Sequence, residues 1–297
     1  MSEDSSSDDS ININRPKPVV LLLIDGWGVA PLNEANVFSS ARIPVFLSFI
    51  KEYPVAVLKS FGKNLNLNYL NLGLGQKLTS ENIELQPGLT NAIAKAGLKQ
   101  LKISETERFA AITHFFNGLN ENKENSEHWV IVSSESSVSN HKSVLALKRS
   151  FKEITRAINE DKYNFILVSW PLLDLVSATG DFEDVKKAVE TLDTYLKKVS
   201  IAVQSKGGVL IVSATHGNVE KIKNVLTELI DNEITDNPVP FLIVGEEFKG
   251  KTIGLTDTMD DDLSLLEAAG DLSDIAPTIL KILGIEKPDN MKGNSLI

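Results

Sequence analysis

The sequence contains no cysteine, which excludes disulfide bonds and thiolate metal sites. It is also poor in positive charge: 30 Lys and Arg residues face 40 Asp and Glu residues, so the formal net charge is -10. Nucleic acid phosphates bind to basic faces, and we therefore expect no nucleic acid partner. Metal ions or cationic protein surfaces suit so acidic a chain better.

Long hydrophobic runs are absent as well. None approaches the roughly 20 apolar residues that a membrane-spanning helix needs, so we expect no membrane partner. The first ten residues are rich in Ser and Asp and lack the basic start and apolar centre of a signal peptide. They cannot bury enough surface to fold, which predicts a disordered acidic tail over residues 1–17, with a phosphorylation cluster at Ser5 to Ser7 as the sharper alternative. We expect a cytoplasmic protein.

The rest of the chain, residues 18–297, is predicted to be a single domain. Apolar runs of strand length alternate there with segments whose apolar residues recur at helical spacing. Strands are predicted at 18–25, 99–103, 128–133, 163–169, 208–213 and 239–244, and helices at 89–96, 145–158, 182–203, 218–230 and 273–283. The alternation predicts an α/β fold, a three-layer sandwich with a mostly parallel central sheet. The prolines around the run 239–244 favour a position near an edge of the sheet.

Polar residues that could carry chemistry follow three of the buried strands. Asp25 closes the first strand, Asp174 comes soon after the strand at 163–169, and His216 follows the strand at 208–213. Ligand sites of parallel sheets lie at the carboxyl ends of the strands, so we expect these side chains to converge there. Taken singly, each residue is equally typical of a turn or a helix cap. The chain has no nucleophile elbow, P-loop or dinucleotide-binding glycine motif.

A set of longer motifs resembles one enzyme family. The motifs cover Val19 to Asn36, Leu70 to Gly75, Ala92 to Gln100, Ser104 to Phe109, Thr113 to Gly118, Ala214 to Asn218, Asn237 to Phe241, Asp274 to Leu280 and Met291 to Ile297. As a set they are similar to cofactor-independent phosphoglycerate mutase, within the alkaline-phosphatase superfamily. They extend over nearly everything after the acidic tail, so the resemblance implies an alkaline-phosphatase-like fold.

The resemblance also implies a role in glycolysis, by phosphoryl transfer between two hydroxyls of glycerate. In the family, two Mn²⁺ or similar ions flank a serine nucleophile and stabilise the developing charge. An inserted second domain closes over the substrate and supplies basic residues. By position, Asp174 would serve one metal, and Asp25 with His216 would serve the other. Arg108 stands where the family has a lysine, which implies a role in substrate binding.

The sequence differs from the family at the positions of the nucleophile and of several metal ligands. Leu65 stands at the position of the serine nucleophile. Ala178 replaces a histidine ligand and Thr215 replaces an aspartate ligand, and no histidine follows Gly217. The inserted domain is missing between about residues 76 and 103. Most of the parts that phosphoryl transfer needs are therefore absent.

Two functional hypotheses follow. The first is a pseudoenzyme that acts as a binding or scaffold module, with no catalytic residue and no cofactor. The second is an active metal-dependent phosphoglycerate mutase or phosphohydrolase, in which Asp25, Asp174 and His216 hold Mn²⁺ or another divalent cation. A catalytic site usually needs about three protein ligands for its metal, and neither metal keeps them, which favours the first hypothesis. Without a metal ion, the carboxylates of Asp25 and Asp174 would repel each other. We therefore expect them either to lie apart or to accept a hydrogen bond from a donor such as His216.

Two further features bear on these hypotheses. The hydroxyl-rich run from Ser133 to Ser139 could supply a substitute nucleophile, but an exposed loop is the simpler interpretation. Loss of the inserted domain predicts that Trp27, Tyr69 and Trp170 lie exposed at the strand ends, where aromatic anchors favour a protein partner or self-association. Burial of these rings under the shortened connection from 76 to 102 is the alternative.

Overall fold

The computed structural model describes residues 15–79, 86–134, 140–223, 230–231, 233–254 and 262–297. Positions 1–14 of the predicted tail, including Ser5 to Ser7, therefore lie outside the described residues. The strands are β1 (Val19–Ile24), β2 (Val55–Lys59), β3 (Gln100–Glu105), β4 (Glu127–Val132), β5 (Phe165–Trp170), β6 (Val209–Ser213), β7 (Val239–Val244) and β8 (Gly270–Asp271). The α-helices are α1 (Pro44–Glu52), α2 (Leu65–Leu74), α3 (Leu89–Lys95), α4 (Asn140–Asn159), α5 (Leu172–Ser177), α6 (Phe182–Gln204) and α7 (Ile275–Ile282).

The strands form one sheet in the order β4-β3-β5-β1-β6-β7-β2-β8. Strand β1 is central, pairs in parallel with β5 and β6, and is buried along its whole length. Its unbroken apolar run suits this place, because a strand covered on both faces has no polar side. Among the strands described, only β7 runs against its neighbours. The prediction of a mostly parallel sheet is confirmed.

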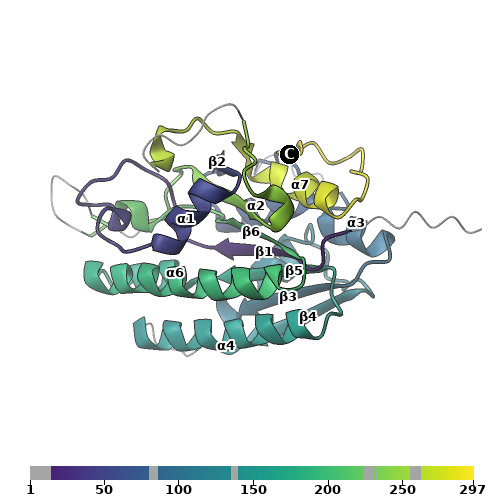
Figure 1. The fold of residues 1–297 in the computed structure, drawn as a ribbon, viewed down its shortest axis with the longest axis horizontal. Coiled ribbons are helices and arrows are strands. Elements are labelled where there is room, and N and C mark those ends of the chain that lie inside the picture. The colour runs from purple at the N-terminus through teal and green to yellow at the C-terminus, as the bar shows by residue number, and fades with distance from the viewer. Residues whose placement is uncertain (1–14, 80–85, 135–139, 224–229, 232, 255–261) are drawn as a thin grey trace, which may run out of the picture.

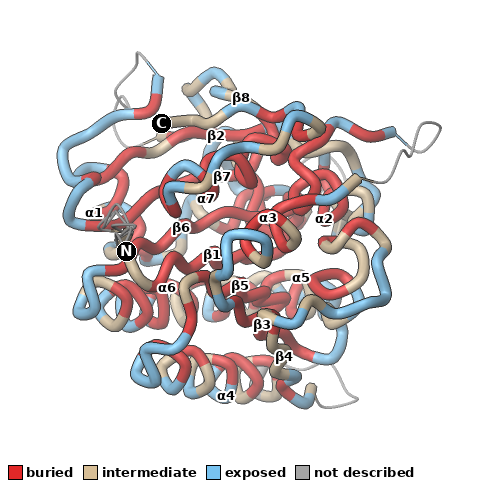
Figure 2. The backbone as a smooth tube through the Cα atoms, turned by 90° about the vertical axis from the view of Figure 1, so that its right-hand side faces the viewer, coloured by how far each residue is buried: buried red, intermediate tan, exposed pale blue. Residues whose placement is uncertain are grey.

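Helices cover both faces of the sheet (Figure 1). Helices α1, α4 and α5 contact α6 in one layer, whereas α2, α3 and α7 contact one another in the other layer. Figure 2 shows buried backbone concentrated in the strands and exposed backbone along the outer sides of α4 and α6. The predicted three-layer sandwich is therefore confirmed. No helix in the described parts of the chain is long and apolar enough to cross a membrane.

The predicted edge position of the strand at 239–244 is wrong. Strand β7 lies inside the sheet, between β6 and β2. Two strands that were not predicted, β2 and β8, separate it from the edge. Pro240 faces the end of β6, where its carbonyl accepts a hydrogen bond of 2.8 Å from the Ser213 hydroxyl. The proline nitrogen faces the same side, past the last residue of β6, so its missing N–H removes no bond of the ladder.

The predicted helix at 218–230 is also wrong where it is described. Only a single 3-10 turn forms, at Val219–Lys221, and Lys223 then pairs with Ile230 in an isolated antiparallel bridge. Residues 224–229 lie outside the described residues. At the described positions, the apolar spacing that is compatible with a helix gives a 3-10 turn and a bridge instead, because propensity is a weak guide.

Candidate functional site

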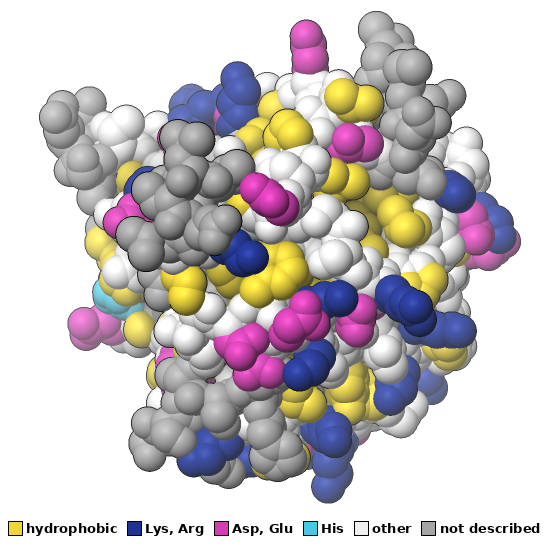
Figure 3. Space-filling model, turned by 90° about the vertical axis from the view of Figure 1, so that its left-hand side faces the viewer, with side chains coloured by type: hydrophobic (Ala, Val, Ile, Leu, Met, Phe, Trp, Pro, Cys, Tyr) yellow, Lys and Arg dark blue, Asp and Glu magenta, His cyan; other side chains and the backbone are white. Residues whose placement is uncertain are grey.

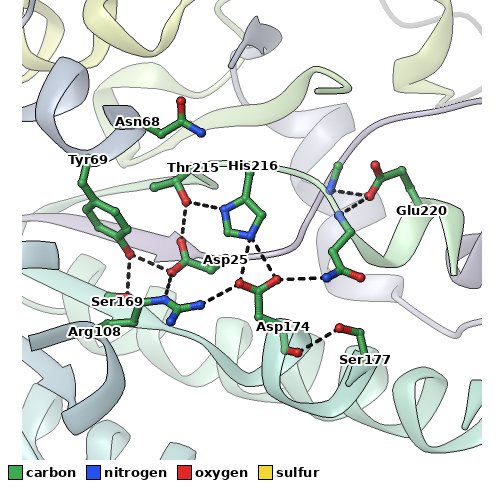
Figure 4. A network of polar contacts seen from close by, with 12 residues as sticks. Asp25, Asn68, Tyr69, Arg108, Ser169, Asp174, Ser177, Thr215, His216 and Glu220 are labelled. Carbon is green, nitrogen blue, oxygen red and sulfur yellow. Dashed lines mark hydrogen bonds and ion pairs between the residues drawn. The ribbon is translucent and has the colours of Figure 1, made fainter. Parts of the chain in front are cut away.

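Strands β5, β1 and β6 are neighbours, and their carboxyl ends bring together the three residues singled out from the sequence (Figure 4). Asp25 directly follows β1, Asp174 lies in helix α5 just after β5, and His216 lies in the loop after β6. Gly26 allows Asp174 to approach: its φ is +91°, and a Cβ there would lie 2.7 Å from Asp174 Oδ1. A glycine is needed at this turn for both conformation and space.

His216 is buried between Asp174 and Thr215. Its Nε2 lies 2.8 Å from Asp174 Oδ2, and its Nδ1 lies 2.8 Å from Thr215 Oγ1. The Thr215 hydroxyl donates its only hydrogen to Asp25 Oδ1 at 2.7 Å, so Nδ1 must be the donor toward Thr215. Where an ionised Asp174 accepts from Nε2, the contacts on both ring nitrogens are those of a doubly protonated, cationic His216. Burial lowers the pKa of His216, but Asp174 outweighs burial and raises it.

Arg108 places a second cation between the two carboxylates. It ends the 3-10 turn Thr106–Arg108 that follows β3. Its Nε donates to Asp25 Oδ2 and its Nη2 donates to Asp174 Oδ2, each at 2.7 Å (Figure 4). Burial alone would lower the pKa of Arg108, but the two carboxylates raise it. Two anions and two cations thus form one closed network, and the substrate-binding role implied for Arg108 stays a prediction.

The aromatic residues expected at an exposed edge are buried. Tyr69, on α2, and Trp170, at the end of β5, have no exposed surface, and Trp27 is only 3% exposed. The Tyr69 hydroxyl donates to Asp25 Oδ2 at 2.8 Å and lies 2.9 Å from Ser169 Oγ. The expectation of exposed aromatic anchors is therefore wrong: Tyr69 bonds the end of β1, Trp170 donates to Ser150 on α4 at 2.9 Å, and Trp27 packs against two phenylalanine rings.

The network leaves no carboxylate oxygen of Asp25 or Asp174 without a protein donor. The donors are Thr215, Tyr69 and Arg108 for Asp25, and His216, Arg108 and Asn218 for Asp174. Divalent cations are held by carboxylate oxygens that are free to coordinate. Within the ranges that the structure describes, no group of three or more His, Asp and Glu could hold a metal ion. These residues do not fit the pair of metals that the resemblance implies.

Leu65, which the resemblance places at the position of the family's serine, is the first residue of helix α2. Its side chain is half-buried and packs against the hydrophobic core. The Leu65 side chain does not cap the helix. The cap is Asn64, whose side chain accepts a hydrogen bond of 3.2 Å from the Leu67 backbone N–H. Ala178, which the resemblance places at the position of a histidine ligand, directly follows the last residue of α5. Neither side chain has an atom that could attack phosphorus or bind a metal.

Glu105, the last residue of β3, is a buried carboxyl that the sequence analysis did not single out. Its side chain is 1% exposed, and neither oxygen has a hydrogen-bond partner in the described part of the chain. Burial and then the nearby Glu107 raise the pKa of Glu105 to about 8. It lies three residues before Arg108, but its oxygens take no part in the network. No local sequence pattern predicts a buried carboxyl of this kind, because neighbouring strands and helices bury Glu105.

Of the serine run, only Ser133 and Ser134 lie within the described residues. Ser134 Oγ donates to Glu107 and accepts from the Thr106 backbone at 3.2 Å. These contacts join the end of β4 to the turn after β3, which is a structural role. Ser136, Ser137 and Ser139 lie outside the described residues, so the structure does not test their proposed role as nucleophiles.

An apolar cleft of about 290 Å³ lies beside Trp27. The rings of Phe38 and Phe46 lie 5.0 and 4.6 Å from the Trp27 ring, and Leu32 and Leu47 are exposed at the rim. In Figure 1, strand β1 points toward the side of the molecule that faces the viewer in Figure 3. On that face, hydrophobic side chains form separate patches among acidic and basic ones (Figure 3).

Known proteins similar to this chain agree with its fold and motifs. A family model described as the metalloenzyme superfamily matches residues 17–287. A 2,3-bisphosphoglycerate-independent phosphoglycerate mutase of Nitrosococcus oceani is 36% identical over 206 residues, which cover 69% of this chain and 37% of the relative. The chain thus spans about two fifths of the length of the curated relatives it matches.

Solved structures give the same picture. The crystal structure of phosphoglycerate mutase from Leishmania mexicana aligns with a TM-score of 0.56 and 27% identity, over 69% of this chain and 38% of that one. TAB5 alkaline phosphatase aligns over 92% of this chain and 99% of that one, with a TM-score of 0.52 and 11% identity, a likeness of fold alone. The chain therefore belongs to the metalloenzyme superfamily, with an alkaline-phosphatase-like fold and with cofactor-independent phosphoglycerate mutases among its relatives.

Proposed function

We propose that this chain is a phosphoglycerate-mutase-like pseudoenzyme that serves as a binding or scaffold module. The observation that carries the proposal is Leu65 at the start of α2, where the family places its serine. A phosphoenzyme intermediate needs an oxygen atom at this position, and leucine has none. The loss of one member of a catalytic unit can alone lower a rate by about 10⁶.

The state of the carboxylates supports the same proposal. In an active enzyme of this kind, Asp25 and Asp174 would turn free oxygens toward metal ions, which in turn stabilise charge on the phosphoryl group. Here their oxygens accept hydrogen bonds from Arg108, His216 and other protein donors. Among the described residues, Asp25 and Asp174 therefore offer no free carboxylate oxygen to a divalent cation.

The test is an assay of purified protein from a host that lacks its own mutase. Interconversion of 3- and 2-phosphoglycerate, and hydrolysis of p-nitrophenyl phosphate, are measured with and without Mn²⁺. We expect no turnover above a buffer control, beside an intact phosphoglycerate mutase assayed in parallel. Robust turnover by the wild type would contradict the proposal.

The second candidate is a metal-dependent mutase or phosphohydrolase. It is favoured by one observation, the convergence of Asp25, Asp174 and His216 at the strand ends. Turnover that requires Mn²⁺ and is abolished by Asp174→Asn would establish this candidate in place of the first.

For the binding role we propose a cytoplasmic protein partner or a second copy of the chain. Because the expected aromatic anchors are buried, the cleft beside Trp27 is the surface to test. Sedimentation of the wild type is compared with a Leu32→Asp, Leu47→Asp variant. A concentration-dependent dimer that the two substitutions abolish would support self-association through this cleft, and a dimer that they leave unchanged would contradict it.

A further inference from the structure

We propose that the Arg108 guanidinium is the built-in counter-cation of Asp25 and Asp174, which takes the place of divalent metal ions and makes this site independent of metal. The proposal goes beyond catalytic inactivity, because it assigns the cation that holds the two carboxylates together. It also has readouts, in stability and in metal binding, that are separate from enzyme activity.

The geometry of the guanidinium carries the proposal. Its Nε and Nη2 are separate nitrogens of one rigid planar group, and each donates to a different carboxylate at 2.7 Å. The Arg108 side chain is 12% exposed, and the carboxylates of Asp25 and Asp174 are 0% and 11% exposed. Short, charge-assisted hydrogen bonds with so little solvent are the strong kind. One cation therefore bridges two anions, as a metal ion would.

The choice of arginine over lysine has a physical reason. An ammonium is a compact point charge at the end of a flexible stem, whereas a guanidinium is a rigid fork whose separate N–H groups can hold two partners at once. A lysine at position 108 could neutralise one carboxylate but would not fix both. A guanidinium at position 108 therefore suits a bridge between two carboxylates better than an ammonium would.

The carboxylates need this cation because they are close and buried. Asp174 reaches His216 Nε2, whose neighbour Thr215 bonds Asp25, so both anions belong to one small enclosure. Like charges in such a place repel strongly unless a cation separates them. Arg108 also joins three segments that are distant in sequence: the turn after β3, the end of β1 and helix α5. Its removal should therefore loosen the whole strand-end region.

The experiment compares wild type with Arg108→Met and Arg108→Lys, by thermal unfolding in EDTA and in Mn²⁺ and by Mn²⁺ calorimetry. We expect EDTA and Mn²⁺ to leave the wild-type Tm unchanged. Arg108→Met should lower the Tm by about 5–10 °C in EDTA, recover part of this loss in Mn²⁺ and bind the ion, whereas Arg108→Lys should lose less. The matched control is Arg156→Met, on the exposed face of α4, with an expected change of about 1 °C.

A second background separates charge from packing. In a variant with Asp25→Asn and Asp174→Asn, the counter-cation has no carboxylates to serve, so Arg108→Met should cost far less there. An equal loss of Tm in both backgrounds would assign Arg108 to packing and overturn the proposal. Should Arg108→Met not fold alone, the triple variant should fold, and its failure would overturn the proposal too. Tight Mn²⁺ binding by the wild type would do the same, whatever the activity assays show.

Discussion

The hydroxyl of Tyr69 donates a hydrogen bond of 2.8 Å to Asp25, 44 positions earlier in the chain. This bond joins helix α2, which begins at Leu65, to the end of the central strand β1. The Tyr69 side chain, which was expected to be exposed at the strand ends, is fully buried. Its hydroxyl gives Asp25 a hydrogen-bond donor from the protein itself. The residue expected to bind a partner is thus part of the internal polar network.

Tyr69→Phe should lower the free energy of unfolding by about 1–3 kcal/mol, since it removes a buried donor to a charged group. The fold should persist, because Asp25 keeps its bonds to Arg108 and Thr215. Denaturant unfolding measures the change. The control is Tyr53→Phe, whose hydroxyl makes one longer bond of 3.2 Å to Gln204 and should cost less. Equal losses for the two variants would contradict this account of Tyr69.

Glu105→Gln should stabilise the protein, increasingly as pH rises from about 4.5 to about 8. The pKa of Glu105 is raised to about 8 in the folded chain from 4.5, so over this range the unfolded chain ionises while the folded chain stays protonated. The unfolded state then binds fewer protons, and stability falls with pH. At about 1.4 kcal/mol per pKa unit, the penalty near pH 8 amounts to a few kcal/mol.

Unfolding free energies of wild type and Glu105→Gln, measured from pH 4 to pH 9, test this prediction. The two curves should meet near pH 4 and diverge above it. Glu286→Gln, at an exposed carboxyl, serves as the control and should follow the wild type. Parallel curves for Glu105→Gln and wild type would show that Glu105 ionises normally in the folded protein.

Lys102→Met should destabilise the fold by about 3–5 kcal/mol, because it leaves a buried carboxylate without its cation. Lys102 Nζ lies 2.9 Å from Glu127 Oε1, and neither side chain is exposed. The double variant Lys102→Met, Glu127→Gln should recover much of the loss, since it removes the unpaired charge. Denaturant unfolding of the wild type, the two single variants and the double variant gives the coupling between the two residues, and the absence of coupling would contradict a paired role.

Leu65→Ser should not create mutase activity. The added hydroxyl would lack a metal to activate it, because Arg108 and His216 engage the carboxylates and Thr215 stands where the family has an aspartate. The assay is interconversion of 3- and 2-phosphoglycerate with and without Mn²⁺. Turnover by this single variant would show that a metal does enter the site.

Trp170→Ala should report on folding rather than on binding. The ring has no exposed surface, and its Nε1 donates to Ser150 on helix α4 at 2.9 Å. We expect a loss of about 3–5 kcal/mol in unfolding free energy, the usual result of truncating a buried tryptophan. A variant with wild-type stability would imply that the ring is exposed in solution.

Much of the fold could be predicted because its signals are local. The central strands are unbroken apolar runs that fit only a covered position, and α6 carries its apolar stripe at helical spacing. Elements without such signals were missed: α2 has several asparagines among its leucines and β8 has two residues. The predicted helix at 218–230 is limited in its described part to the 3-10 turn Val219–Lys221, after which Lys223 pairs with Ile230.

The sequence by itself determined that Asp25, Asp174 and His216 lie near strand ends of one sheet, since each follows an apolar run that can only be a buried strand. It also determined that Leu65 cannot act as a nucleophile, because that follows from the side chain alone. Only the tertiary structure decided that Arg108 bridges the carboxylates and that Tyr69 is buried against Asp25. The reason is physical: partners, burial and charge balance are properties of segments that meet in space, and no short stretch of sequence contains them.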